Sequence, residues 1–229
     1  MYDGLKFIAQ DYLDKGEIEM SLKYYEKCAK EGDADSLFSI GHIYENGKGN
    51  IQVDIEKSIE YYKLASEKGN VNAMRNLAFI YLLNKNGKDE NVKAIHYFSL
   101  AADSGDILSL YQLGSIYQKG SIVPVDYKKS FEYYKKCSQK KYVPSYLKIA
   151  VFYEKGLGVE RDIKKAIKYY SISAKHQSIF SLKHLGFIYS KGELVEKDLE
   201  KATSYFLEAA ELGDEVSLKS YIHLKKSKK

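Results

Sequence analysis

Apolar residues recur at steps of three and four along most of the chain, which is the spacing of one face of an α-helix. One such stripe covers residues 110–117 and another covers residues 163–174. Gly120 follows the first stripe and Asp162 precedes the second. Glycine is a common C-terminal cap of a helix, and aspartate is a common N-terminal cap. The pattern therefore predicts pairs of helices joined by short loops.

The pattern also repeats at a nearly constant interval. Five similar phrases begin at positions that we call anchors, spaced 37, 36, 36 and 36 residues apart. They are SLFSIGHIYENG at Ser36, AMRNLAFIYLLN at Ala73, SLYQLGSIYQKG at Ser109, SYLKIAVFYEKG at Ser145 and SLKHLGFIYSKG at Ser181. One hairpin cannot bury its own apolar stripe, so neighbouring hairpins are expected to stack into a continuous core.

This repeat explains an unusual composition, with 22 tyrosines and no tryptophan. Six tyrosines occupy one position of the first helix, and ten occupy a pair of adjacent positions in the second helix. These sixteen are predicted to pack the core. A small residue recurs in the first helix, where we expect the close approach of a neighbouring helix: Gly41, Ala78, Gly114, Ala150 and Gly186.

These motifs resemble those of the Sel1-like repeat (SLR) family, which is related to the tetratricopeptide repeats but has a longer loop between its helices. Residues 145–180 carry most of the family pattern: Tyr153, Gly156, Gly158, Val159, Asp162, Lys165, Ala166, Tyr169, Tyr170 and Ala174. The resemblance covers roughly residues 5–224. Lys141 and Gln177 depart from it, since glycine usually ends the second helix. The resemblance implies protein–protein interaction, usually in an adaptor role, without indicating one partner.

We therefore expect an all-α fold, a right-handed α-solenoid of about six helix-turn-helix repeats of ~36 residues plus a C-terminal capping helix. The whole chain, residues 1–229, is expected to form a single repeat domain. Its expected parts are a short first repeat 5–35, full repeats 36–72, 73–108, 109–144, 145–180 and 181–216, and a capping helix 217–226.

Residues that could carry out chemistry do not cluster in the sequence. Cys28 and Cys137 stand at the same repeat position, where other repeats have alanine or serine, so we interpret both as small buried residues without a disulfide. The five histidines lack metal-ligand spacing, and the glycine-rich segments 47–49 and 156–158 lack the features of a phosphate-binding loop. We expect no catalytic, cofactor or metal site, and no enzyme.

Hydropathy and charge narrow the class of protein. The mean hydropathy is −0.43 and no apolar run approaches 18 residues, so no membrane span is expected. No secretory signal is visible, so we expect a cytoplasmic protein, and we expect it to be a monomer. Residues 1–115 carry 13 basic and 18 acidic side chains, whereas residues 116–229 carry 23 and 13. This polarity favours an oppositely charged partner, or it reflects solvated outer faces and the basic tail 224–229. Nucleic acid is disfavoured, because the lysines are spread over many helices.

Tetratricopeptide geometry would place the first helix of each repeat on a concave face. By this analogy, the positions one before and two, six, nine and ten after each anchor point inward, and many are apolar or aromatic. Such residues are typical of interaction sites. The predicted partner-binding residues are Phe38, His42, Arg75, Phe79, Leu82, Leu83, Tyr111, Leu147, Val151, Phe180, Lys183 and Phe187. The alternative is that curvature of the solenoid buries several of them against adjacent helices.

The sequence thus predicts a non-catalytic scaffold or adaptor that binds a partner protein or peptide along the concave first-helix face. One alternative is a bacterial immunity or regulatory protein that sequesters an effector, since some bacterial SLR proteins are immunity proteins. No residue selects that alternative. An enzyme or an enzyme subunit is the less favoured one, because no cluster of histidine, cysteine or carboxylate residues supports it.

Overall fold

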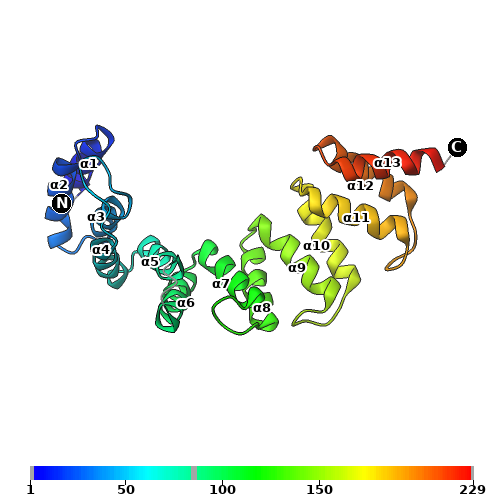
Figure 1. The fold of residues 1–229 in the computed structure, drawn as a ribbon, viewed down its shortest axis with the longest axis horizontal. Helices are drawn as coiled ribbons and strands as arrows, with labels where there is room; N and C mark the ends of the chain where they lie inside the picture. The colour runs from blue at the N-terminus through cyan, green and yellow to red at the C-terminus, as the bar shows by residue number, and fades with distance from the viewer. Residues whose placement is uncertain (1–2, 84–86, 228–229) are drawn as a thin grey trace. The chain divides into compact units, whose positions relative to one another are not determined.

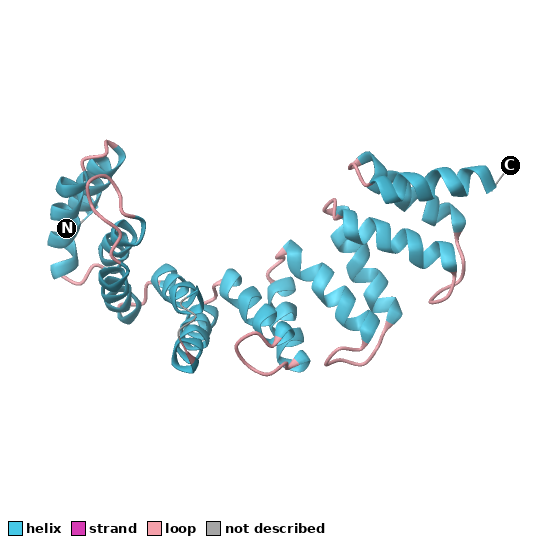
Figure 2. Cartoon of the chain, viewed as in Figure 1, coloured by secondary structure: helices cyan, strands magenta, loops and turns pink. Residues whose placement is uncertain are grey.

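The computed structural model describes residues 3–83 and 87–227. Thirteen α-helices and their connecting loops make up these ranges, and no strand occurs within them (Figure 2). The chain divides into two compact units, residues 1–109 and residues 110–229, named unit 1 and unit 2 below. The predicted all-α solenoid of helical hairpins is confirmed.

Unit 1 contains three hairpins in chain order (Figure 1). The helices pair as α1 with α2, α3 with α4 and α5 with α6, and α2 packs on α3 as α4 packs on α5. Their bounds are α1 Asp3–Asp14, α2 Ile18–Lys30, α3 Ala34–Asn46, α4 Ile55–Glu67, α5 Val71–Leu83 and α6 Lys88–Asp103. Each hairpin buries its apolar stripe against the next one, as a repeat fold requires.

Unit 2 continues the same arrangement, beginning within the first turn of α7. Here α9 pairs with α10 and α11 with α12, while α13 packs on α12. The bounds are α7 Ile107–Lys119, α8 Tyr127–Gln139, α9 Val143–Lys155, α10 Ile163–Lys175, α11 Ile179–Lys191, α12 Leu199–Glu211 and α13 Glu215–Ser227. The last helix includes the capping segment 217–226 and extends beyond both of its ends.

The helix ends follow the cap chemistry. In each second helix with a leading aspartate, the side chain accepts a backbone N–H hydrogen bond at 2.9 Å three residues on: Asp54, Asp126, Asp162 and Asp198. First helices end at glycines with positive φ: Gly47, Gly120, Gly156 and Gly192. Lys141 and Gln177 adopt φ of 60° at the end of a second helix, so the turn is kept there without glycine.

The second aromatic residue of each doublet lies at the centre of its hairpin. Tyr62 and Tyr134 are fully buried, and a Cβ placed on Gly41 or Gly114 would lie 2.8 Å from the ring of one or the other. The small residue of the first helix is therefore needed. What approaches it is an aromatic ring from the second helix of the same hairpin.

The first tyrosine of each doublet stacks on the tyrosine of the first helix. Ring centroids lie 5.6–6.0 Å apart and the planes are within 14° in six such pairs: Tyr12–Tyr24, Tyr44–Tyr61, Tyr81–Tyr97, Tyr117–Tyr133, Tyr153–Tyr169 and Tyr189–Tyr205. In five of them a lysine ammonium lies 4.9–5.3 Å from the first-helix ring: Lys57, Lys93, Lys129, Lys165 and Lys201. Repeat packing thus accounts for the tyrosine excess.

The two cysteines are small core residues, as predicted. Cys28 and Cys137 are completely buried and neither forms a disulfide. Burial raises the pKa of the Cys137 thiol to about 12, because a thiolate would lose its hydration there. The thiol of Cys137 is therefore held in its protonated, unreactive form.

Candidate functional site: the first-helix face

The surface formed by the first helices of the repeats carries the predicted partner-binding residues. We call this surface, taken in each unit by itself, the first-helix face; α3 and α5 supply it in unit 1, and α9, α11, α13 and residues 110–119 of α7 supply it in unit 2. None of the twelve predicted side chains is fully buried. Leu83 and Phe180 are 75% and 50% exposed, and the other ten are half-buried.

The position two residues after the anchor joins one repeat to the next. Arg75 Nη1 lies 2.5 Å from Asp106 Oδ1, and Lys183 Nζ lies 2.9 Å from Asp214 Oδ1. Each aspartate also accepts a 2.8 Å hydrogen bond from the backbone N–H three residues on, at the start of the next first helix. Both cations are therefore neutralised within the chain, and they stabilise the joint between repeats.

Other predicted partner-binding residues pack within the chain as well. The ring of Tyr111 lies 5.4 Å from Tyr142, which directly precedes α9, and 5.2 Å from Tyr134. Phe38 stacks on Tyr62 with the centroids 5.5 Å apart. Leu147 and Val151 pack against the core around Tyr170. These side chains serve the packing of the repeats, and each keeps an exposed edge.

The position nine residues after the anchor accepts a hydrogen bond from the buried tyrosine of its hairpin. Three hydroxyl groups donate in this way: Tyr62 to Glu45 at 2.6 Å, Tyr134 to Gln118 at 3.0 Å and Tyr170 to Glu154 at 2.7 Å. Burial, reinforced by the bond to a carboxylate, raises the pKa of Tyr62 and Tyr170 above the ordinary value. Both phenols therefore remain protonated donors.

The same network reaches the following repeat. The amide of Asn76 donates to the Tyr62 hydroxyl at 3.0 Å. His184 Nε2 lies 2.9 and 3.0 Å from the two carboxylate oxygens of Glu154. Asn76 and His184 both stand three residues after an anchor, so each network links two consecutive repeats.

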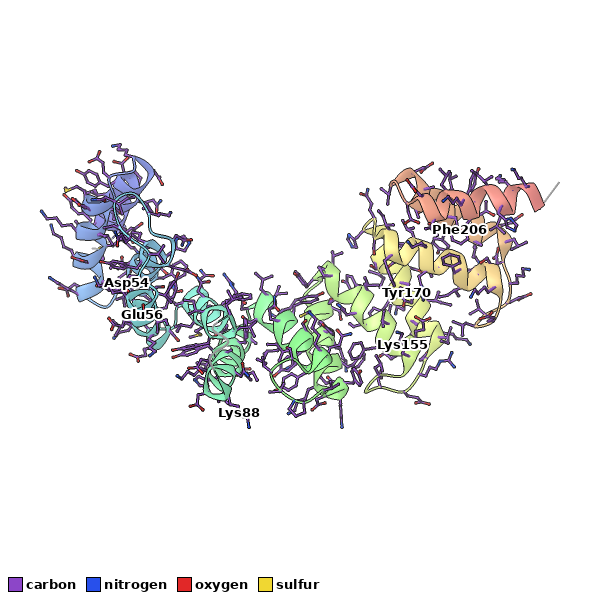
Figure 3. All side chains as sticks on the ribbon, viewed as in Figure 1. Asp54, Glu56, Lys88, Lys155, Tyr170 and Phe206 are labelled. Atoms are coloured by element: carbon purple, nitrogen blue, oxygen red, sulfur yellow. The ribbon has the colours of Figure 1, made fainter. Side chains whose placement is uncertain are left out.

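Two repeats replace the buried tyrosine by phenylalanine, and the surrounding positions change with it. With Phe98 and Phe206 there is no hydroxyl to bind, and Leu82 and Ser190 stand where other repeats have glutamate or glutamine. Six residues after the anchor, Phe79 and Phe187 then pack edge-on against Phe98 and Phe206, with centroids 5.1 Å apart in each pair. Figure 3 labels Tyr170 and Phe206, which represent the two kinds of repeat in consecutive hairpins of unit 2.

Two recesses adjoin Phe187 on the first-helix face of unit 2. The larger, about 330 Å³, is called the Phe206 recess and is lined by Phe187, Ser190, Phe206, Lys219, Ser220, His223 and Leu224. The smaller, about 160 Å³, is lined by Glu154, His184, Phe187, Ile188, Lys191, Glu193 and Leu194. The exposed Phe180 stacks on His184 with the centroids 5.6 Å apart. Aromatic groups and charges thus meet here at accessible positions.

Larger recesses lie elsewhere, beside the loops between the helices. One of about 630 Å³ adjoins Tyr189 and Lys201, and one of about 550 Å³ adjoins Tyr117 and Lys129. Their linings include the capping aspartate, the lysine and the tyrosine of the repeat framework. A framework feature that recurs along the chain gives little specificity, so these recesses are weaker candidates than the first-helix face.

A family model for the Sel1 repeat matches residues 9–33, 34–70, 71–106, 107–141, 143–178 and 180–214. The chain belongs to the Sel1 repeat family. The matched segments have the predicted period; the last five lie about two residues earlier than the expected repeats, and the first begins at residue 9 rather than 5. Sel1 repeat proteins generally mediate protein–protein interaction and are typically non-catalytic scaffolds. No curated protein matches this Sel1 repeat protein.

Solved structures support the same fold. The Sel1 repeat protein resembles c5321, a protective antigen of uropathogenic Escherichia coli with an SLR fold, at 24% identity and a TM-score of 0.84. The alignment covers 97% of this chain but only 48% of the c5321 chain. A Sel1 repeat protein from Oxalobacter formigenes matches at 25% identity and a TM-score of 0.68, over 93% of this chain and 86% of that one. An immunity protein from Pseudomonas aeruginosa aligns at 16% identity and a TM-score of 0.47, over 89% and 81% of the two chains, too distantly to support a function.

Several residues of the site in this Sel1 repeat protein were not among the predicted ones. His184 lies three residues after the Ser181 anchor. Lys219 and Ser220 lie two and three residues after Ser217, which stands a further 36 residues along and acts as a sixth anchor. Phe206 comes from a second helix. A sequence signal for them exists: the buried tyrosine and its acceptor change together in the repeat that ends at α12. This paired change can be interpreted only once the structure shows that α11 and α12 are in contact.

Within residues 3–83 and 87–227, no group of three or more histidine, cysteine or acidic side chains is placed to hold a metal ion. In the same ranges of the Sel1 repeat protein, no helix is both long and apolar enough to cross a membrane.

Proposed function

We propose that this Sel1 repeat protein is a non-catalytic scaffold that holds a segment of a partner protein on its first-helix face. The observation that carries the proposal is the group of accessible aromatic side chains and recesses around Phe180 and Phe187 in unit 2. In unit 1, Leu83 is 75% exposed at the end of the first helix α5. Neither Phe180 nor Leu83 fills the core of its unit, so partner binding gives them a role.

The twelve predicted residues divide into two groups under this proposal. Arg75 and Lys183 hold the next repeat through aspartates, so they shape the face without offering a free charge. The remaining ten line the face: Phe38, His42, Phe79, Leu82, Leu83, Tyr111, Leu147, Val151, Phe180 and Phe187. A monomeric protein in the cytoplasm remains our expectation for the setting in which binding occurs.

The test is affinity purification of the tagged full-length protein followed by mass spectrometry. The double variant Leu83→Ser, Phe180→Ser removes two strongly exposed apolar groups of the first helices, at 75% and 50% exposure, without opening a core. The matched control is Leu64→Ser, Leu207→Ser, which removes side chains that are 47% and 37% exposed on second helices. We expect the first variant to lose the captured partner and the control to retain it. Loss in the control alone would place binding on the second helices and contradict the proposal.

A further inference from the structure

The Phe206 recess exists because the last hairpin of unit 2 lacks the polar bridge of its neighbours. In the preceding hairpin the hydroxyl of Tyr170 reaches the carboxylate of Glu154, and His184 completes the bridge. The corresponding residues are Phe206, Ser190 and Ser220. All three are shorter, so the space that the bridge occupies elsewhere is open as a recess of about 330 Å³.

The other phenylalanine repeat carries a larger residue at the position of Ser190. Phe79 packs edge-on against Phe98 at the same 5.1 Å as Phe187 against Phe206, and Leu82 stands where Ser190 stands. The leucine side chain supplies the apolar group that serine lacks. The volume of the Phe206 recess is near the lower end of the about 300–1,000 Å³ typical of ligand sites, which suits one large side chain.

The chemistry of the recess favours an aromatic side chain. Its floor is the edge-to-face pair Phe187–Phe206, and aromatic rings prefer to add to such a pair in further edge or offset contacts. The hydroxyls of Ser190 and Ser220 donate to backbone carbonyls of their own helices, at 3.1 and 2.9 Å. The lining is thus apolar below and polar at the sides.

The charge around the recess favours an acidic partner. Unit 2 carries 23 lysine and arginine residues against 13 aspartate and glutamate residues. Lys219 lines the recess itself, whose seven lining residues include no aspartate or glutamate, whereas the neighbouring recess carries Lys191 beside Glu154 and Glu193. A segment with negative charge is attracted to this surface, and a basic segment is repelled from it.

Lys148 supplies a second, independent point of attraction. It stands three residues after its anchor, as Asn76 and His184 do. The position of the preceding repeat that carries Glu45 or Glu154 in their networks carries the neutral Gln118 here. Lys148 is half-buried, and within the described part of the chain it forms no ion pair. Burial and the nearby charge of Lys119 both lower the pKa of Lys148, as expected for a cation without a counter-charge.

We propose that unit 2 binds an acidic peptide segment of a partner protein, with an aromatic side chain in the Phe206 recess and a carboxylate facing Lys148 and Lys119. This inference rests on the proposed function, and it names the class of partner that the first-helix face of unit 2 binds. It is independent of Leu83 and of the rest of unit 1.

The probe is a fluorescein-labelled peptide of about ten residues, glutamate throughout except for one phenylalanine, titrated with the full-length protein by fluorescence anisotropy. Ser190→Leu copies the arrangement of Leu82 and closes the recess while keeping the fold. Ser204→Leu, on the exposed side of α12, is its control. We expect the first change to weaken binding about tenfold or more, as for loss of an anchor pocket, and the second to leave it unchanged.

Charge is tested with Lys148→Gln, and with Lys168→Gln as the control on the exposed side of α10. We expect about two- to fivefold weaker binding for Lys148→Gln only, with a smaller dependence on salt. A peptide with alanine in place of phenylalanine should bind about tenfold more weakly, and one with lysine in place of glutamate should not bind. Equal binding of the alanine peptide, or preference for the lysine peptide, overturns the assignment.

Further outcomes also decide between possibilities. Failure of the acidic aromatic peptide to bind, or unchanged binding by Ser190→Leu, overturns the inference. Sedimentation that shows a dimer of the wild type, dissociated by Ser190→Leu, would assign the recess to a second copy of the chain and would equally overturn it. The proposed function is tested separately. If the Leu83→Ser, Phe180→Ser variant loses its captured partner while the Ser190→Leu variant keeps it, the scaffold function is supported. Only the assignment of an acidic, aromatic partner is then wrong.

Discussion

The hydrogen bond between Tyr170 and Glu154 is the most sensitive point of the network that links consecutive repeats. Tyr170→Phe keeps the buried ring and removes only the hydroxyl, which donates to the Glu154 carboxylate at 2.7 Å. A hydrogen bond to a charged group contributes about 1.5–3 kcal/mol. Because Glu154 keeps His184 at 2.9 Å, we expect the lower end, a loss of about 1.5 kcal/mol.

The assay is guanidinium unfolding followed by circular dichroism, with Tyr169→Phe as the control. Tyr169 is the other member of the doublet; its ring stacks on Tyr153 at 5.8 Å, and its hydroxyl makes no hydrogen bond within the described residues. We expect a change below about 0.5 kcal/mol for the control. In a thermal melt followed by the same signal, the melting temperature of Tyr170→Phe should fall by roughly 3–6 °C. Equal losses for the two variants would refute a specific contribution of the hydroxyl, as would no loss for Tyr170→Phe.

Three further predictions follow from local geometry. Lys141→Gly should stabilise the protein by about 0.5–1 kcal/mol in the same unfolding assay, because lysine is held there at φ 60°, and an unchanged midpoint would contradict this. The Cys137 thiol, whose pKa burial raises to about 12, should react with a chromogenic disulfide reagent only at the rate of unfolding; fast reaction of the native protein would show the burial to be wrong. The pKa of Asp214 is lowered, first by the hydrogen bond from Ser217 and then by Lys183. The contribution of Asp214 to stability is therefore present above about pH 4 and is lost as the pH falls through the lowered pKa. Asp214→Asn should reduce the loss of stability between about pH 4 and pH 2, as measured by thermal melting across that range.

The helices were predictable because the forces that start and stop them are local. Asp162 caps α10 through a backbone N–H three residues away, and Gly156 ends α9 with a positive φ. Both signals occupy fixed places in the sequence. The repeat period then placed every hairpin, because each position performs the same packing role in each repeat.

Contacts between repeats were not predictable in the same way. Arg75 looked like a free cation of the binding face, but it pairs with Asp106, 31 residues further along the chain. Which side chains meet across that interval depends on the rotation of one hairpin relative to the next, and the packing of whole helices sets that rotation. The Phe206 recess escaped prediction for the same reason, since it arises from three shortened side chains on three different helices.

Hydrogen–deuterium exchange on the complex with the captured partner tests the central claim most directly. Binding on the first-helix face should slow amide exchange in α9, α11 and α13 of unit 2, because bound segments reduce local opening of the helices that they cover. Exchange in the exposed turns of α8, α10 and α12 should change little. Protection confined to those second helices or to the loops between the helices would contradict the account.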